Sequence, residues 1–395
     1  MVNTMETKNY FHRMRKRLIT LGVNPADARK VALTFDRQVE NQGIYNALSY
    51  YKRVGETLIG YLSHSGYKAP WVKTRNGFPK CLQPLQHYDD VVLLRVAKMA
   101  RALELEVPTE EQVQKLGNAA ESPSTAEEGS LHELSRLISL GIKLCRFHVS
   151  EFPKGFTSVF SQARTFVSRS VPTGTAVGLD VDNIFGVFQH WKPHIVDIPG
   201  WEQAVYPLHH SYLGRNSHKY STFPYSGQVG GVMENGGKLR LFAAPSVLLQ
   251  VYLEPLQIWL DSFRNQMPSD VFRDQKSGAL WAQDKLKAGV RIQSVDLSAA
   301  TCRFPFESQL RLCRELGAPE WSLNLYEQVS RSPWICQPHM ADWLNQPTLK
   351  WEVGQPLGLN PSMSSFALCH SLLLVGLAHE LNLDIWDSFR VLGDD

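Results

Sequence analysis

Ser388-Phe389-Arg390-Val391-Leu392-Gly393-Asp394-Asp395 is a short, largely apolar run that leads into a glycine and two adjacent carboxylates. Glycine accepts the positive φ of a tight turn, and paired carboxylates supply the oxygen ligands that Mg²⁺ prefers. We therefore predict a buried strand that delivers Asp394 and Asp395 into a turn. Gly-Asp-Asp is weak evidence by itself, because about one chain in ten of this length contains it by chance. The interpretation depends on segments upstream.

A second acidic strand is predicted earlier in the chain. Between Val290 and Asp296, Val290 and Ile292 alternate with polar residues. This period of two is typical of a strand with one apolar face, and it places Asp296 at the carboxyl end. Two such strands side by side would bring Asp296 and Asp394 together.

Two further segments suit a site for a phosphorylated ligand. Residues 354–362, Gly-Gln-Pro-Leu-Gly-Leu-Asn-Pro-Ser, form a glycine-rich loop before the long apolar segment 366–381. Residues 236–242, Gly-Gly-Lys-Leu-Arg-Leu-Phe, place Lys238 and Arg240 on one face of a predicted strand. Two cations on one face can stabilise the charge that grows during phosphoryl transfer.

Together these residue types fit template-directed nucleotide addition. In that reaction a primer 3′-hydroxyl attacks an α-phosphorus, while two Mg²⁺ ions lower the pKa of the hydroxyl and carry charge on the leaving pyrophosphate. Asp296 and Asp394 would hold both ions, with Asp395 assisting, and the basic pair would grip the triphosphate. Gly358 would let the backbone approach the nucleotide and the template closely.

Each of these residues also has an ordinary structural interpretation. Asp394 fits a turn residue, Asp296 an N-cap, Gly358 a turn glycine and the basic pair an exposed strand face. We expect all of these to hold together, in this order and spacing, about one time in ten. The conjunction therefore favours a functional site.

Composition places the chain among globular proteins. With 395 residues and 43% hydrophobic side chains, it is long enough for two or three domains. The net charge of +3 does not indicate a nucleic-acid binder, so a basic groove must come from local clustering. Six scattered cysteines without a Cys-x-x-Cys pair argue against structural zinc and favour a reducing compartment. The strongly apolar run at residues 371–378 is too short to cross a bilayer, so we expect no membrane span.

The N-terminal part reads as mainly helical. Residues 92–103 carry apolar side chains at the spacing of one helix face. The acidic pair that begins at Asp89 precedes this run, where Asp is a favoured N-cap, and we predict a cap rather than a metal site. Residues 117–130 are polar and lack apolar anchors, which indicates a linker. Ser130 and Glu133 then predict a capping box for the next helix.

Four motifs together resemble viral RNA-dependent RNA polymerases, most closely those of the narnavirus, mitovirus and ourmiavirus type. The second motif is similar to the family form Asp-Leu-Ser-x-Ala-Thr-Asp-Arg-x-Pro and here reads Asp-Leu-Ser-Ala-Ala-Thr-Cys-Arg-Phe-Pro over residues 296–305. In family order, the matching segments are the basic motif F at 236–243, motif A at 295–305, motif B at 354–370 and motif C at 393–395.

The resemblance implies an α+β right-hand polymerase fold. Helix-rich fingers and an N-terminal region would precede an incomplete palm made of an antiparallel sheet with helices, and the thumb would be absent. The implied segments are a helical N-terminal region at 1–116, a linker or exposed loop at 117–130, a fingers region at 131–289 and a partial palm at 290–395.

The resemblance also implies RNA-templated RNA synthesis for replication of a viral RNA genome. The cofactor would be Mg²⁺ or Mn²⁺, and the partners would be the RNA template and product and ribonucleoside triphosphates. Replication would take place in the host cytoplasm, with the mitochondrion as the alternative. The implied catalytic and metal-binding residues are Asp296, Asp394 and Asp395, and the implied nucleotide-binding residues are Lys238, Arg240, Cys302, Gly358, Asn360 and Ser362.

Two features depart from the family pattern. Cys302 stands where the family has an aspartate that helps recognise the ribose 2′-hydroxyl, so sugar selection is altered or is carried by Asn360 or Ser362. A thiol is a weak hydrogen-bonding substitute. The sequence also stops at Asp395, where a return strand is expected. We therefore expect a truncated chain, or one half of a divided polymerase that a second polypeptide completes with the missing palm strand and thumb.

The competing hypothesis is a non-catalytic RNA-binding or replication-complex scaffold protein that keeps a palm fold. Cys302 and the early end favour it. The retained carboxylates oppose it, because adjacent buried carboxylates are costly without a metal. A catalytic palm predicts that the carboxylates of Asp296 and Asp394 lie close enough to share a cation.

Overall fold

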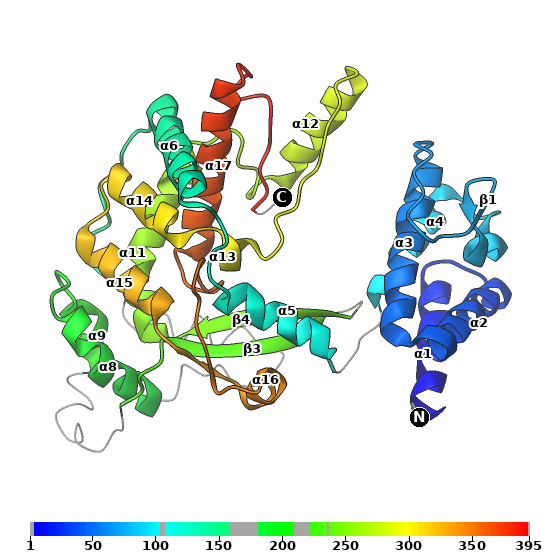
Figure 1. The fold of residues 1–395 in the computed structure, drawn as a ribbon, viewed down its shortest axis with the longest axis horizontal. Coiled ribbons are helices and arrows are strands. Elements are labelled where there is room, and N and C mark those ends of the chain that lie inside the picture. Colours follow the sequence, from blue (N-terminus) through cyan, green and yellow to red (C-terminus); the bar gives the residue numbers. More distant parts are fainter. Residues whose placement is uncertain (1–3, 103–106, 158–180, 209–221, 235–236, 394–395) are drawn as a thin grey trace. The chain divides into compact units, whose positions relative to one another are not determined.

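The structure is a computed structural model that describes most of the chain (Figure 1). The described residues are 4–102, 107–157, 181–208, 222–234 and 237–393. Asp394 and Asp395 therefore lie outside the described residues. The chain divides into two compact units, an N-terminal unit of residues 1–112 with 232–240 and a larger unit of residues 113–231 with 241–395.

Helices build most of the N-terminal unit. Its elements are α1 (Thr4–Thr20), α2 (Pro25–Gln42), α3 (Ile44–Leu62), the short strands β1 (Thr74–Arg75) and β2 (Phe78–Pro79), the 3₁₀ helix η1 (Lys80–Leu85), α4 (Asp90–Ala97) and the 3₁₀ helix η2 (Met99–Ala102). Helix α2 packs against α1 and α3, and α4 packs on α3. The core of this unit holds fully buried aromatic side chains, among them Phe35, Tyr51 and Phe78.

Polar side chains fix the beginnings of two of these helices. At the start of α2, Asn24 Oδ1 accepts hydrogen bonds from the backbone N–H groups of Ala26 at 3.0 Å and Asp27 at 2.9 Å. These bonds satisfy N–H groups that have no partner within the helix. At the start of α4, Asp89 accepts a hydrogen bond from Val92 N at 2.8 Å. The predicted cap at Asp89 is thus confirmed.

The larger unit adds a small sheet to a set of helices. Its helices are α5 (Glu110–Glu121, whose first residues belong to the N-terminal unit), α6 (Glu128–Cys145), α8 (Val181–Ile195), α9 (Glu202–Leu208), α11 (Val247–Arg264), α12 (Gln275–Lys287), α13 (Ala300–Arg303), α14 (Phe306–Leu316), α15 (Glu320–Arg331), α16 (Pro338–Leu344) and α17 (Ser362–Glu380). The described residues thus form a helix-rich α+β fold, in agreement with the predicted fold class.

The sheet has four strands in the order β4-β3-β5-β6. They are β3 (Gly227–Glu234), β4 (Lys238–Pro245), β5 (Trp334–Cys336) and β6 (Thr348–Leu349). Strand β3 runs parallel to β5, with Gln228 opposite Ile335, and β5 runs antiparallel to β6, with Trp334 opposite Leu349. The tip of the β3–β4 pair, residues 232–240, clusters with the N-terminal unit.

Helix α17 is the central helix of the larger unit. It packs against α6, α11 and α14 (Figure 1). Among the described helices it is the one long and apolar enough to cross a bilayer, but 67% of that apolar window is buried inside the protein. Packing in this core accounts for its apolar sequence.

The two predicted acidic strands do not form as regular strands, and these predictions were wrong. Residues 290–297 follow α12 as a largely exposed segment without a ladder partner in the described chain. Near the C-terminus, Val391 forms an isolated parallel bridge with Asp270. Its N–H donates to Ser269 O at 2.8 Å, and Val271 N donates to Val391 O at 2.9 Å. A strand needs a partner for its backbone groups, and the partner that Val391 finds is the 269–271 segment.

The predicted linker is narrower than the sequence suggested. Helix α5 continues to Glu121 and α6 begins at Glu128, so residues 122–127 are the non-helical part of 117–130. The predicted capping box at Ser130 is wrong. The N-cap of α6 is Glu127, whose side chain makes no cap hydrogen bond. Helix α6 begins two residues upstream of Ser130, at Glu128, and packing against α17 stabilises it.

Candidate functional site

The glycine-rich loop at residues 354–362 contacts the motif A segment directly. Gly354 N donates to Cys302 O at 3.0 Å, and Gln355 N donates to Thr301 O at 2.8 Å. A Cβ atom at Gly354 would lie 2.1 Å from Thr301 O. Glycine is therefore required here, because any side chain would collide with backbone. This contact ties motif B to the residues that follow Asp296.

The other end of the same loop is fastened to strand β4 and helix α11. Gly358 has φ +133°, and a Cβ atom there would lie 2.0 Å from Ala243 O. Ala243 N donates to Leu357 O at 3.2 Å, and Gln250 Nε2 donates to Gly358 O at 2.7 Å. Gly358 thus lets the loop approach β4 closely, and its predicted approach to the nucleotide and template stays a prediction. In the described chain, motif B is held between motif A and the end of the motif F strand.

A buried polar network holds the loop from inside. Gln355, fully buried, accepts a hydrogen bond from Tyr326 Oη at 2.8 Å and donates to Gln309 Oε1 at 3.0 Å and Ser362 O at 2.8 Å. Ser365 Oγ donates to Gln309 Oε1 at 2.8 Å. The network joins α14, α15 and α17 to the loop. These residues give no sign of the network in the sequence, because an isolated Gln, Tyr or Ser in an amphipathic helix looks the same whether it is buried in a network or lies on a polar surface.

Tyr326→Phe tests this network. The tyrosine hydroxyl is fully buried, and its loss leaves Gln355 Oε1 without that donor. We expect a loss of about 1–2 kcal/mol in the free energy of unfolding, which chemical denaturation of the purified protein measures. Tyr51→Phe is the matched control, because in the described structure the Tyr51 hydroxyl is buried without a hydrogen-bond partner. Equal losses in the two variants would contradict the network.

The first three turns of α17 lie next to residues of both motif A and motif C. Leu297, which follows Asp296, packs against a small buried cluster of Ala300 in motif A with Phe366 and Ala367 of α17. Gly393 of motif C lies beside the same turns, because its carbonyl oxygen is 3.3 Å from His370 Nδ1. Gly393 has φ +69°, as the turn prediction requires. One helix therefore lies next to both acidic motifs.

The carboxylate of Asp296 is exposed on this segment. No salt bridge to it is found among the described residues, and no group of three or more His, Cys, Asp or Glu side chains able to hold a metal is found among them. An exposed carboxylate without a competing cation fits a ligand of Mg²⁺ or Mn²⁺. The other two predicted ligands, Asp394 and Asp395, are outside the described residues, so the expected approach of Asp296 to Asp394 stays a prediction.

A buried ion pair supports the backbone at motif C. Arg264 Nε lies 2.8 Å from Asp270 Oδ2, and both side chains are less than a tenth exposed. Asp270 is the bridge partner of Val391. On the α17 side, Ser364 Oγ donates to Asp261 Oδ1 at 2.7 Å, and Asp261 lies 3.5 Å from Arg264. Breaking a buried pair leaves an uncompensated charge, so this arrangement holds the segment before Gly393 in place.

The three residues proposed for sugar recognition have different surroundings. Cys302 is half-buried and its Sγ accepts a hydrogen bond from Trp351 Nε1 at 3.3 Å. Burial raises the pKa of the Cys302 thiol, so the group is neutral at pH 7. Asn360 Nδ2 donates to Gln250 O at 2.9 Å, which gives this amide a structural role. The Ser362 hydroxyl is buried and has no hydrogen-bond partner in the part of the chain that is described.

The basic pair of motif F lies on β4. Lys238 and Arg240 are exposed and Leu239 between them is buried, as the alternating sequence predicts. Arg240 Nε lies 2.6 Å from Glu234 Oε1, and these two side chains are 54% and 40% exposed. Both basic residues belong to the N-terminal unit.

Comparison with known proteins adds one match. Residues 186–395 match the family described as Mitovirus RNA-dependent RNA polymerase, and this stretch is more than half of the chain. The match includes all four motifs and the helix that joins motifs A and C. No curated protein matches the chain.

Proposed function

The chain belongs to the mitovirus RNA-dependent RNA polymerase family, and from this we propose that it copies an RNA template by nucleotidyl transfer with two divalent metal ions. The family supports RNA-templated RNA synthesis in viral replication, with RNA and ribonucleoside triphosphates as substrates. The observation that carries the proposal is the position of α17: its Phe366 shares a small apolar cluster with Ala300 of motif A, and its His370 lies 3.3 Å from the carbonyl oxygen of Gly393 in motif C.

In the proposed site, Asp296 and Asp394 hold Mg²⁺ or Mn²⁺, and Asp395 assists. Such ions, when bound, lower the pKa of the attacking 3′-hydroxyl and offset the charge of the leaving pyrophosphate. Lys238 and Arg240 bind the triphosphate. Their positive charges stabilise the negative charge that grows on the leaving pyrophosphate in the transition state. The motif B loop keeps motif A in place through its backbone bonds to Thr301 and Cys302.

Residues 290–395 would then form palm and residues 131–289 fingers in the right-hand fold. The chain acts where the viral RNA is replicated, which we assign to the host cytoplasm, with the mitochondrion as the alternative. A labelled-ribonucleotide incorporation assay tests the function. Incorporation that needs RNA template and Mg²⁺, by this chain alone or with a complementing polypeptide, supports it.

The second candidate function is a non-catalytic RNA-binding scaffold. It is favoured by Cys302 and by residues 290–297, which are largely exposed and pair with no strand in the described chain. If the chain binds RNA but incorporates no ribonucleotides, either alone or with a complementing polypeptide, and an active polymerase works as positive control, the scaffold function is supported.

Cys302→Asp tests the site of sugar selection. The thiol lies next to Trp351 Nε1, and an aspartate there would add a charged acceptor that the family uses for the ribose 2′-hydroxyl. A hydrogen bond to a charged group is worth about 1.5–3 kcal/mol, so we expect about a tenfold rise in the preference for ribonucleotides over deoxyribonucleotides. Cys302→Ser is the size-matched neutral control. An unchanged ratio in Cys302→Asp would refute the assignment of this position.

A further inference from the structure

The N-terminal unit contains a cavity that the motif F strand shares with helices far upstream in the sequence. Its volume is about 380 Å³, within the size range of small-ligand sites. All of its described lining residues fall within residues 1–112 and 232–240, which form one compact unit. They are Lys52, Gly55, Glu56 and Ile59 of α3, Ala97, Lys98 and Ala100 near the end of α4, and Glu234, Lys238 and Arg240 of the β3–β4 pair.

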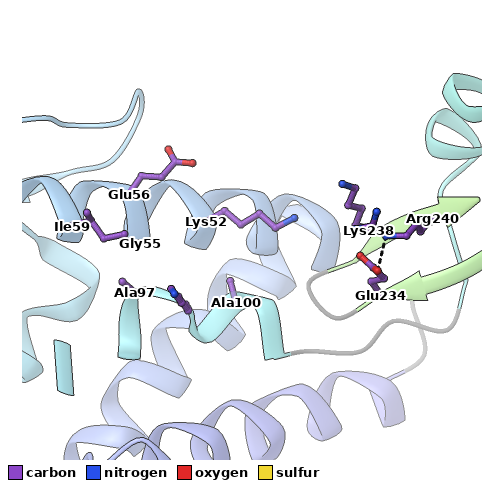
Figure 2. Close-up of a pocket in the computed structure, with 10 residues that line it drawn as sticks. Lys52, Gly55, Glu56, Ile59, Ala97, Ala100, Glu234, Lys238 and Arg240 are labelled. Carbon is purple, nitrogen blue, oxygen red and sulfur yellow. Dashed lines mark hydrogen bonds and ion pairs between the residues drawn. The ribbon is translucent and has the colours of Figure 1, made fainter. Parts of the chain in front are cut away.

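Among the described residues that line this cavity, cationic side chains outnumber anionic ones. Four of these side chains are cationic and two are anionic. Figure 2 shows Lys52 extending along α3 toward Lys238, whereas the carboxylate of Glu56 points upward, away from Ala97 and Ala100. Lys52, Lys98, Lys238 and Arg240 all reach solvent. Like charges around one hollow repel one another, and a bound anion would offset this repulsion.

One of the acidic side chains is already paired. The bond between Arg240 Nε and Glu234 Oε1 is short, but both groups are about half exposed. Exposed ion pairs contribute little free energy, so a phosphate can displace Glu234 from Arg240 at low cost. Glu234 therefore competes with an anion for the same guanidinium.

We propose that this cavity is a phosphate-binding site in which Lys52 and Lys98 of the N-terminal helices act together with Lys238 and Arg240. The ligand is a phosphate-bearing nucleotide, either the triphosphate of a free ribonucleotide or the backbone of an RNA strand. The inference rests on the proposed function, since it extends the basic motif of the polymerase to a region without a recognised motif. It gives the N-terminal helices a direct part in substrate binding.

Binding measured without synthesis tests the proposal. The full chain and its Lys52→Gln and Lys98→Gln variants are titrated with a fluorescent single-stranded RNA at several salt concentrations, and with an azido-labelled ribonucleoside triphosphate by photocrosslinking. If the ligand is RNA, each substitution lowers the slope of log affinity against log salt by about 0.7. If the ligand is the free nucleotide, crosslinking falls several-fold and the RNA slope is unchanged.

Glu234→Gln is expected to change ligand affinity in the opposite direction. Removal of the competing carboxylate is expected to raise affinity for the same ligand about threefold. Lys80→Gln, at an exposed lysine of the same unit outside the cavity, is the control for lost surface charge.

Two outcomes separate this inference from the proposed function. If Lys52→Gln and Lys98→Gln bind both probes as Lys80→Gln does, while Lys238→Gln binds less, the inference is overturned and the proposed function stands. Loss of binding in the two lysine variants, together with normal synthesis by Asp296→Ala, supports the phosphate site and overturns the catalytic assignment. Melting temperatures verify that each variant is folded.

Discussion

Asp296→Ala is expected to lower RNA synthesis about a thousandfold or more, because it would remove a proposed metal ligand and with it several kcal/mol of transition-state stabilisation. The fold should be unaffected. Asp296 is exposed on a segment outside any helix or strand, and it makes no ion pair among the described residues. Substitutions at such positions change stability by less than about 0.5 kcal/mol. Rates of labelled-nucleotide incorporation and thermal melting measure the two effects separately.

Gln293→Ala is the matched control for this prediction. It lies on the same exposed segment and carries no proposed role. Asp394→Ala should show the same loss of synthesis as Asp296→Ala, since both carboxylates are proposed to hold the ions. Near-normal synthesis in either aspartate variant would refute the metal-site assignment, and a large fall in melting temperature for Asp296→Ala would show a structural role instead.

Gly358→Ala is expected to be the most destabilising single-methyl change in the site. The added Cβ would lie 2.0 Å from Ala243 O, and φ +133° is strained for any residue with a side chain. Both effects act on backbone, which cannot move without breaking the bond from Ala243 N to Leu357 O. We expect a loss of about 4 kcal/mol in the free energy of unfolding, and a fall of about 5–7 °C in melting temperature.

Gly129→Ala is the control for the added methyl group. Gly129 lies in the first turn of α6, and a Cβ atom there would have no neighbour within 4 Å. This change should be neutral or slightly stabilising, because alanine loses less backbone entropy on folding. If Gly358→Ala melts like Gly129→Ala, the tight junction between the motif B loop and β4 does not exist in solution. RNA synthesis should fall with stability at Gly358, since the loop also holds Thr301 and Cys302.

Several features of the site could be predicted from short stretches of sequence. The alternation of Lys238, Leu239 and Arg240 placed both cations on one exposed face. The positive φ of Gly393 and the N-cap at Asp89 also agreed with prediction. The four motifs predicted a polymerase, and the family match agrees. Each of these inferences depends on residue chemistry within a few positions or on the order of motifs along the chain.

Other features required the tertiary structure. The period-two pattern at residues 290–296 predicted a strand, yet this segment has no pairing partner in the described chain. Gly358 lies against the backbone of Ala243, a contact that its sequence does not reveal. Gln355 gave no signal of its buried network.

The sequence by itself therefore determined the family, the helix-rich α+β class and the local geometry of caps, turns and alternating faces. The tertiary structure decided which segments meet: Val391 with Asp270, the motif B loop with motif A and β4, and Lys52 with the motif F cations. Caps and turns form between residues close in the chain, so local chemistry decides them. Strand pairing, close backbone approach and charge clustering join distant segments, and only the packing of the whole chain selects among the available partners.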